Sequence, residues 1–131
     1  MIRRVITLLL ASVVGGLAIF GGIALAADFT QATSLTADGF RSNSKHVVIH
    51  GTLSASAHQA FCTHNQPIKV TKLKTGKTKT TTTDNNGNYS VTFFQNAHKT
   101  RTYRASYGGR QQGVHPNRQV CLGSSAQTTV H

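Results

Sequence analysis

The 131-residue sequence contains no glutamate and only three aspartates, against fourteen lysines and arginines. Hydrolytic acid/base catalysis generally needs two carboxylates held close together. The aspartates are scattered, at Asp28, Asp38 and Asp84, and Asp84 lies in a turn sequence where its side chain can bond the backbone. We therefore expect a protein that is not an enzyme and that needs no cofactor.

Cysteine is equally scarce, since Cys62 and Cys121 are the only two. In a protein that is exported from the cell, two cysteines with no other thiol predict an intramolecular disulfide. Closing a loop of about 60 residues should stabilise the fold by roughly 4 kcal/mol on the chain-entropy model. The same bond would leave no thiolate to act as a nucleophile.

Residues 1–26 are typical of a signal peptide. Arg3 and Arg4 precede an apolar stretch at 5–25, and residues 24–26, Ala-Leu-Ala, fit the small-x-small cleavage rule. We expect cleavage before Ala27 and a secreted protein, extracellular or bound to the cell wall. The apolar run of 21 residues is also long enough to span a bilayer, so an uncleaved membrane anchor is the alternative.

Removal of residues 1–26 takes away two of the 14 basic residues, so the net charge becomes 12 − 3 = +9. Such an excess draws polyanions and repels like molecules. An anionic cell-envelope polymer, an anionic protein partner, and simple solubility outside the cell are all compatible with it. The segment 101–110 sets Arg101 and Arg104 beside Tyr103 and Tyr107, but the alternation points both tyrosines inward, so we expect core packing and no specific nucleic acid.

No helical pattern follows residue 27, and short alternating segments predict strands instead. The expected strands are 31–36, 45–53, 68–73, 77–83, 89–93, 101–107, 119–122 and 126–130. Turns are expected at Asp38-Gly39 and Thr75-Gly76, and a break in the alternation at Leu73 indicates a bulge. These features predict an N-terminal segment at 27–44 with one possible strand, then a β-sandwich domain at 45–131.

The stretch 82–93 predicts a hairpin. Asp84, Asn85, Asn86 and Gly87 suit a tight turn, and Tyr89, Val91 and Phe93 then share one face of the following strand. The sequence accordingly predicts an all-β protein, an antiparallel sandwich of six or seven strands in Greek-key order.

A small set of residues gives a family resemblance over 61–130. They are Cys62 before the strand 68–73, the motif T-D-x-x-G-x-Y at 83–89, the run Tyr103-Arg104-Ala105, and Cys121 followed by Ser124. In these the chain resembles the transthyretin-like or carboxypeptidase-regulatory-like modules of secreted bacterial proteins. The resemblance implies an Ig-like (prealbumin-like) sandwich and a non-catalytic accessory role. Related modules with internal isopeptide bonds use a buried acidic residue, and the absence of glutamate argues against such a crosslink here.

A lysine-rich hairpin is the main candidate binding site. Five lysines interleaved with threonines surround the turn at Gly76: Lys69, Lys72, Lys74, Lys77 and Lys79. Lysines that face one another across a hairpin repel unless an anion lies between them, which favours an anion-binding surface. The alternative is that they protect an exposed edge strand against aggregation.

Two further functions stay open. The connection at 54–66 predicts the contact loop of a secreted effector, either an inhibitor or an antimicrobial protein. Seven histidines raise metal binding as a third possibility. His46 and His50 lie about 13 Å apart along one strand, too far to share an ion. His58 and His64 flank Cys62 and are weak candidates, so we expect no metal site and histidines that simply titrate.

Overall fold

The computed structural model describes residues 28–131, so the expected signal peptide lies outside the described residues. The described chain contains eleven strands and one helical turn. They are β1 (Phe29–Gln31), β2 (Thr33–Leu35), β3 (Asp38–Arg41), β4 (His46–Ala55), α1 (Ala60–Thr63), β5 (Pro67–Lys72), β6 (Lys77–Thr82), β7 (Asn88–Phe94), β8 (Arg101–Tyr107), β9 (Arg110–Gln112), β10 (Gln119–Cys121) and β11 (Ser124–Val130). Between residues 28 and 131, no helix has the length and apolar character of a membrane span.

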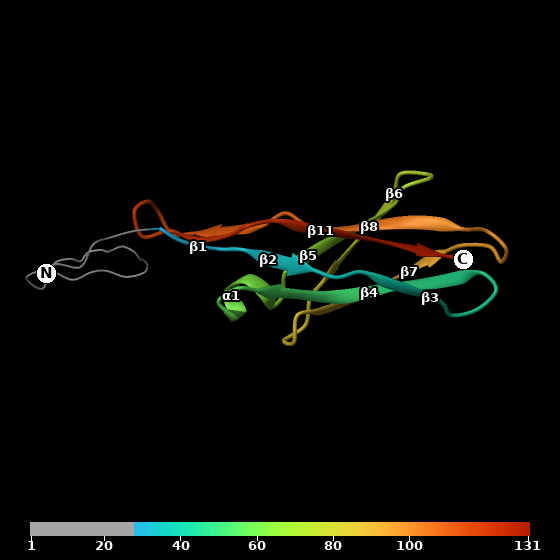
Figure 1. Ribbon diagram of the computed structural model, residues 1–131, viewed down its shortest axis with the longest axis horizontal. Helices are drawn as coiled ribbons and strands as arrows, with labels where there is room; N and C mark the ends of the chain where they lie inside the picture. Colours follow the sequence, from blue (N-terminus) through green and yellow to red (C-terminus); the bar gives the residue numbers. More distant parts are fainter. Residues whose placement is uncertain (1–27) are drawn as a thin grey trace, which may run out of the picture. The chain divides into compact units, whose positions relative to one another are not determined.

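The chain divides into two compact units, and the larger one comprises 30–112 with 119–131. In this unit, one antiparallel sheet has the order β11-β8-β5-β6. A second has β4 at its centre, with β7 on one side and β2 followed by β3 on the other. Figure 1 shows β8 and β11 lying over β4, a sandwich-like arrangement. The all-β class and the antiparallel sheets are confirmed. The segment before residue 45 supplies three strands, where the sequence indicated one.

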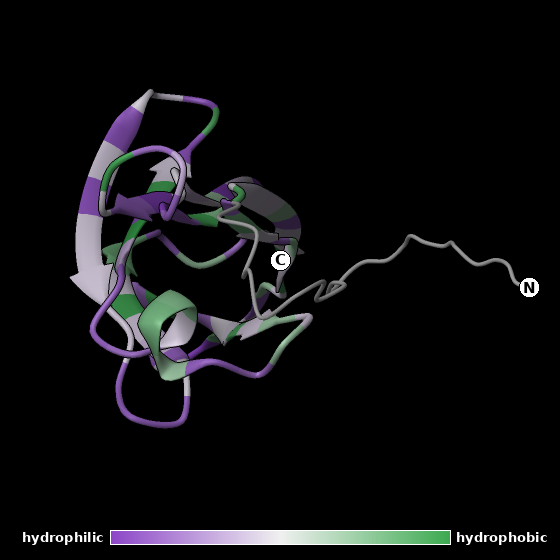
Figure 2. Ribbon diagram, turned by 90° about the vertical axis from the view of Figure 1, so that its left-hand side faces the viewer, coloured by the Kyte–Doolittle hydropathy of each residue, from purple (hydrophilic) through white to green (hydrophobic). Residues whose placement is uncertain are grey.

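The core forms where the inward faces of these strands meet. Alternation along β4 buries Val47, Ile49 and Leu53, while β7 contributes Phe93 and β8 contributes Tyr103. Figure 2 shows the same alternation as bands of different hydropathy along the strands. A fully buried side chain of this size contributes about 1.5–3 kcal/mol, so this shared core is the main stabilising feature of the unit.

The prediction of a hairpin at 82–93 is wrong: the turn is present, but the two strands that it joins do not pair with each other. β6 pairs with β5 and β7 pairs with β4, so the turn carries the chain from one sheet to the other. The Oδ1 atom of Asp84 accepts hydrogen bonds from the backbone N–H groups of Asn86 (2.8 Å) and Asn88 (2.9 Å). These bonds hold the pKa of Asp84 below its ordinary value, because they stabilise the carboxylate. Local turn chemistry was readable from the sequence, whereas the partner of each strand was not.

Three smaller expectations are also corrected. Asp38 and Gly39 lie inside β3 and form no turn, because pairing with β4 holds them extended. A helical turn, α1, is present in the 54–66 connection, where no helix was expected. The strand β5 keeps its alternation without a bulge: Lys72 takes the inward position after Val70, and Leu73 lies outside.

The predicted disulfide is confirmed. Cys62 in α1 bonds to Cys121 in β10, with 5.7 Å between the two Cα atoms and a sequence separation of 59. Both cysteines are buried. The bond therefore ties the helical turn to the sheet formed by β1, β10 and β9.

In the described part of the second unit, residues 28–29 and 113–118, Asp28 is the centre of a small polar cluster. Its carboxylate accepts from the backbone N–H of Arg118 (3.0 Å), from the guanidinium of that residue (2.7 Å) and from His115 (3.2 Å). The bond from the Arg118 backbone is the main reason that the pKa of Asp28 falls to about 2. Within residues 28–131, Asp28 is the only carboxylate that forms a salt bridge.

Candidate anion-binding site

The lysine-rich hairpin forms as β5 and β6, and the structure divides its five lysines among three positions. Lys72 lies directly opposite Lys77, and Lys79 lies opposite the buried Val70, so these three lysines share the inward side. Lys69 alternates to the outer face, and Lys74 lies in the turn. β6 is the edge strand of its sheet, as expected for a strand with no apolar face.

Two of the inward lysines bond to the neighbouring sheet. The ammonium of Lys72 donates to the carbonyl oxygen of Phe94 at 2.6 Å, and that of Lys79 donates to the carbonyl of Thr92. Both carbonyls belong to β7, which pairs with β4 on its other side. The two ammonium groups also lie above the ring of Phe93, at 5.9 and 5.4 Å from its centroid. Lys72 and Lys79 thus have a structural role that Lys69, Lys74 and Lys77 do not share.

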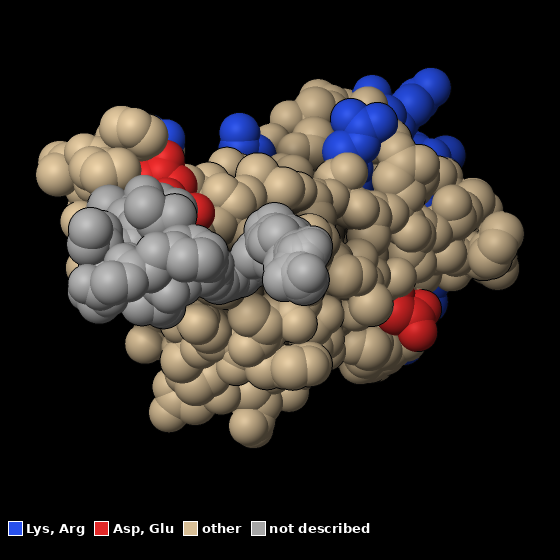
Figure 3. All heavy atoms as spheres, turned by 60° about the vertical axis from the view of Figure 1, so that its left-hand side comes forward, with Lys and Arg blue, Asp and Glu red and all other residues tan. Residues whose placement is uncertain are grey.

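A shallow hollow of about 120 Å³ opens beside Lys72, where the β5–β6 turn meets the β7–β8 loop. Its lining includes three cations and no carboxylate. The lining residues are Lys72, Thr75, Phe94, Gln95, Asn96, Lys99 and Arg101. We call this feature the cationic hollow. In Figure 3, several lysine and arginine side chains gather at the upper right of the molecule.

Lys72 is the buried cation of this hollow, with only 8% of its surface exposed. Burial lowers the pKa of its ammonium below the ordinary value, and the positive charges of Lys77, Arg101 and Lys79 lower it further. A group in this position gains from a nearby negative charge, because an anion offsets both the lost hydration and the repulsion.

The β7–β8 loop is held in place by a buried glutamine. The side chain of Gln95 donates to the carbonyls of Lys99 (2.7 Å) and Val130 (3.0 Å), and it accepts a hydrogen bond from the Tyr103 hydroxyl (2.7 Å). Arg41 holds the start of the loop from outside, through bonds to the carbonyls of Gln95 (2.7 Å) and Asn96 (3.0 Å). The position of Lys99 in the hollow is therefore fixed by side chains of the core.

Sequence reasoning did not place Lys99 with the hairpin, and it treated Arg101 only as a neighbour of Tyr103. These two residues are separated from Lys72 by 27 and 29 positions, and sheet pairing alone brings them together. One signal was available. A lysine that follows Ile68 and Val70 at the same alternation occupies a core-facing position, and such a lysine needs a partner.

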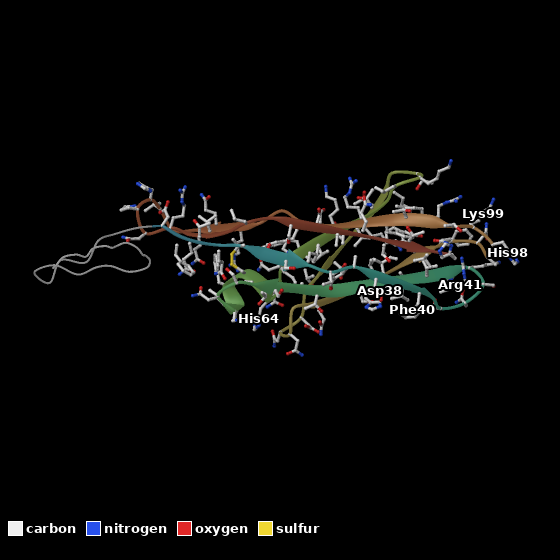
Figure 4. All side chains as sticks on the ribbon, in the orientation of Figure 1. Asp38, Phe40, Arg41, His64, His98 and Lys99 are labelled. Carbon is white, nitrogen blue, oxygen red and sulfur yellow. A yellow bond between two sulfur atoms is a disulfide. The ribbon has the colours of Figure 1, made fainter. Side chains whose placement is uncertain are left out.

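The 54–66 connection lies at the other end of the strands. Figure 4 shows His64 at one end, and Arg41, His98 and Lys99 at the other. A wider hollow of about 430 Å³ is found here, lined by His64, Asn65, Gln66, Pro67, Gly109 and Arg110. A second buried glutamine, Gln66, donates to the carbonyl of His64 (2.9 Å) and accepts from the Tyr107 hydroxyl (2.9 Å).

The histidines are distributed over the surface. His46 packs edge-on against Phe94, and His50 packs against Phe40. In the part of the chain that the structure describes, no group of three or more His, Cys, Asp or Glu residues is placed to hold a metal ion. Register puts Asp38, His50 and Ser90 in one row across β3, β4 and β7, but no hydrogen bond joins these three side chains.

Comparison with known proteins adds no relative to this description: no family model, no curated protein and no solved structure matches the chain.

Proposed function

We propose that the protein is a secreted, non-catalytic binding module that contacts an anionic cell-surface polymer through the cationic hollow and the exposed lysines at the β5–β6 turn, Lys74 and Lys77. The observation that carries this proposal is the convergence of Lys72, Lys99 and Arg101 on one hollow without a carboxylate in its lining. Like charges held this close raise the free energy of the unliganded protein, and a bound polyanion removes that cost.

The proposal includes an Ig-like fold of the transthyretin-like or carboxypeptidase-regulatory-like type. Support comes from the strand order, with β4 and β7 in one sheet and β5, β6, β8 and β11 in the other. In such sandwiches, binding sites lie on the loops at the ends of the strands. Secretion is supported by the disulfide, since such bonds persist mainly in oxidising compartments.

Binding to immobilised polyphosphate and to poly-L-glutamate tests the proposal. We expect retention of the protein on at least one polymer at low salt and release as the ionic strength rises, because salt screens exposed charges over about 10 Å at 0.1 M. Changing Lys74 and Lys77 together to serine should weaken retention, and these exposed side chains leave the core intact. If neither polymer retains the protein at low salt, the proposal is refuted.

A second candidate function uses the 54–66 connection as the contact loop of an inhibitor or antimicrobial protein. The wider hollow beside His64 and Arg110 favours it. In this loop, His58 and Asn65 adopt left-handed backbone conformations, both with φ of 55°, which are uncommon outside glycine and frequent at binding sites. Loss of growth inhibition or protease inhibition in an Arg110→Ser variant, with polymer binding intact, would favour this function over the first.

A further inference from the structure

We propose that the cationic hollow binds one tetrahedral oxyanion, a phosphoryl or sulfate group of the polymer, with Lys72 as the residue that selects it. This inference rests on the proposed function and names its ligand class. The exposed lysines of the hairpin would then supply general attraction, while the hollow would distinguish phosphate or sulfate polymers from carboxylate polymers.

The size of the hollow is the first argument. The hollow is small, with a volume of about 120 Å³, and it opens to solvent. A space of this size suits a single compact anionic group, whereas a folded segment is too large for it. A polymer would therefore place one of its charged substituents in the hollow, while the rest of the chain stays on the open surface.

The donors around the hollow are the second argument. One hydrogen of the Lys72 ammonium is committed to the Phe94 carbonyl, which leaves two of its three donors free. Lys99 and Arg101 bring further donors from the β7–β8 side. Within residues 28–131, the side-chain amide of Asn96 makes no hydrogen bond, and the Thr75 hydroxyl acts only as an acceptor, from the backbone N–H of Lys77.

Such a set matches an anion with several acceptor oxygens. A phosphate monoester carried as a substituent presents three strong acceptor oxygens and a charge of about −1.5 to −2. A carboxylate is planar and has two oxygens, so it would leave more of these donors without a partner. The burial of Lys72 strengthens the preference, because charge-assisted hydrogen bonds are stronger where water is excluded.

Titration of the purified protein with inorganic phosphate, sulfate and acetate, followed by backbone NMR, tests the inference. We expect saturable shifts at Thr75, Asn96 and Lys99 with phosphate and sulfate, and affinity for acetate lower by about tenfold, since fewer charge-assisted bonds form. Lys72→Met should weaken phosphate binding by about tenfold, the cost of one such bond. The matched change Lys69→Met, on the outer face of the same strand, should leave phosphate binding within about twofold.

Because Lys72→Met could disturb packing, a second variant supports the test. Lys99→Ser changes an exposed side chain and should lower phosphate affinity while the melting temperature stays constant. Equal effects of Lys69→Met and Lys72→Met, or shifts spread over all lysines, would overturn the inference. If polyphosphate and poly-L-glutamate then retain the protein equally, the proposed function stands without this selective site. If neither polymer retains the protein, the proposed function itself is refuted.

Discussion

The two ends of the larger unit are held by similar networks but differ in charge and in covalent support. At one end, Tyr103 donates to the buried Gln95, which fixes the β7–β8 loop. At the other, Tyr107 donates to the buried Gln66, which fixes the chain at His64. Both tyrosines lie on β8, four residues apart on the same inward face. One strand therefore anchors a loop at each end.

The difference between the ends concerns what each loop carries. The Gln95 end brings Lys99 and Arg101 toward Lys72 and has no covalent crosslink. The Gln66 end lies next to the helical turn that the disulfide fixes, and Arg110 stacks there on Phe61, 4.1 Å from the ring centroid. We infer that the disulfide end mainly stabilises the fold, and that the cationic end is available for binding.

The largest expected effect comes from breaking the disulfide. A Cys62→Ala/Cys121→Ala variant should lose roughly 4 kcal/mol of unfolding free energy on the chain-entropy model, because the unfolded chain regains the freedom of a 59-residue loop. Urea unfolding of the variant, with the reduced native protein as a control, measures this loss. If the variant still folds, its binding to polyphosphate should be unchanged. An unchanged urea midpoint would contradict the stabilising role.

Removal of the two glutamines separates stability from binding. Gln95→Leu should cost about 3 kcal/mol, because the Tyr103 hydroxyl and the carbonyls of Lys99 and Val130 lose their partner. Gln66→Leu should cost about 2 kcal/mol for the same reason at Tyr107 and His64. Urea unfolding gives both values.

Only the Gln95→Leu variant should also lose polyanion binding, measured by retention on polyphosphate under conditions where both variants are folded. Equal retention of the two variants would show that the β7–β8 loop does not contribute to the site.

A smaller effect concerns Tyr89, which lies in the other sheet and belongs to neither glutamine network. Its hydroxyl donates to the Thr36 carbonyl at 2.8 Å, and burial raises its pKa to about 12. The unfolded tyrosine loses its proton near pH 10, so the stability that the neutral form provides is complete below about pH 10. It is lost progressively as the pH rises from there through about 12.

Tyr89→Phe should therefore cost about 1 kcal/mol at pH 7 and make unfolding less dependent on pH between 10 and 12. Burial raises the pKa of Tyr103 and Tyr107 as well, so some alkaline sensitivity should remain in the variant. Urea unfolding at pH 8, 10 and 11 measures the difference. An identical pH dependence in the two proteins would contradict the assignment.

Much of the fold follows from local patterns in the sequence. Alternation correctly placed Tyr103 and Tyr107 in the core, and the two cysteines predicted their own bond. Those signals are local, or they arise from a pair with no other possible partner. By contrast, the strand with which each strand pairs is decided by contacts between segments far apart in sequence. The change of sheet at the Asp84 turn could therefore not be predicted from the sequence.

The candidate site was predictable only in part for the same reason. The hairpin around Gly76 is contiguous, and its lysines could be grouped from sequence alone. Lys99 and Arg101 join them through the pairing of β5 with β8. Alternation from Ile68 and Val70 gives Lys72 a core-facing position, but the apolar Leu73 beside it led us to expect a bulge instead. A charged side chain at a core position was the informative exception.

The most direct test of the central claim compares two double variants that remove the same charge. Lys99→Ser/Arg101→Ser removes two cations at the cationic hollow, whereas Lys69→Ser/Arg104→Ser removes two from the outer face of β5 and β8. Retention on polyphosphate at low salt should fall by about tenfold or more for the first variant and by less than about threefold for the second. Equal losses would show that net charge alone governs binding and would contradict the existence of a defined site.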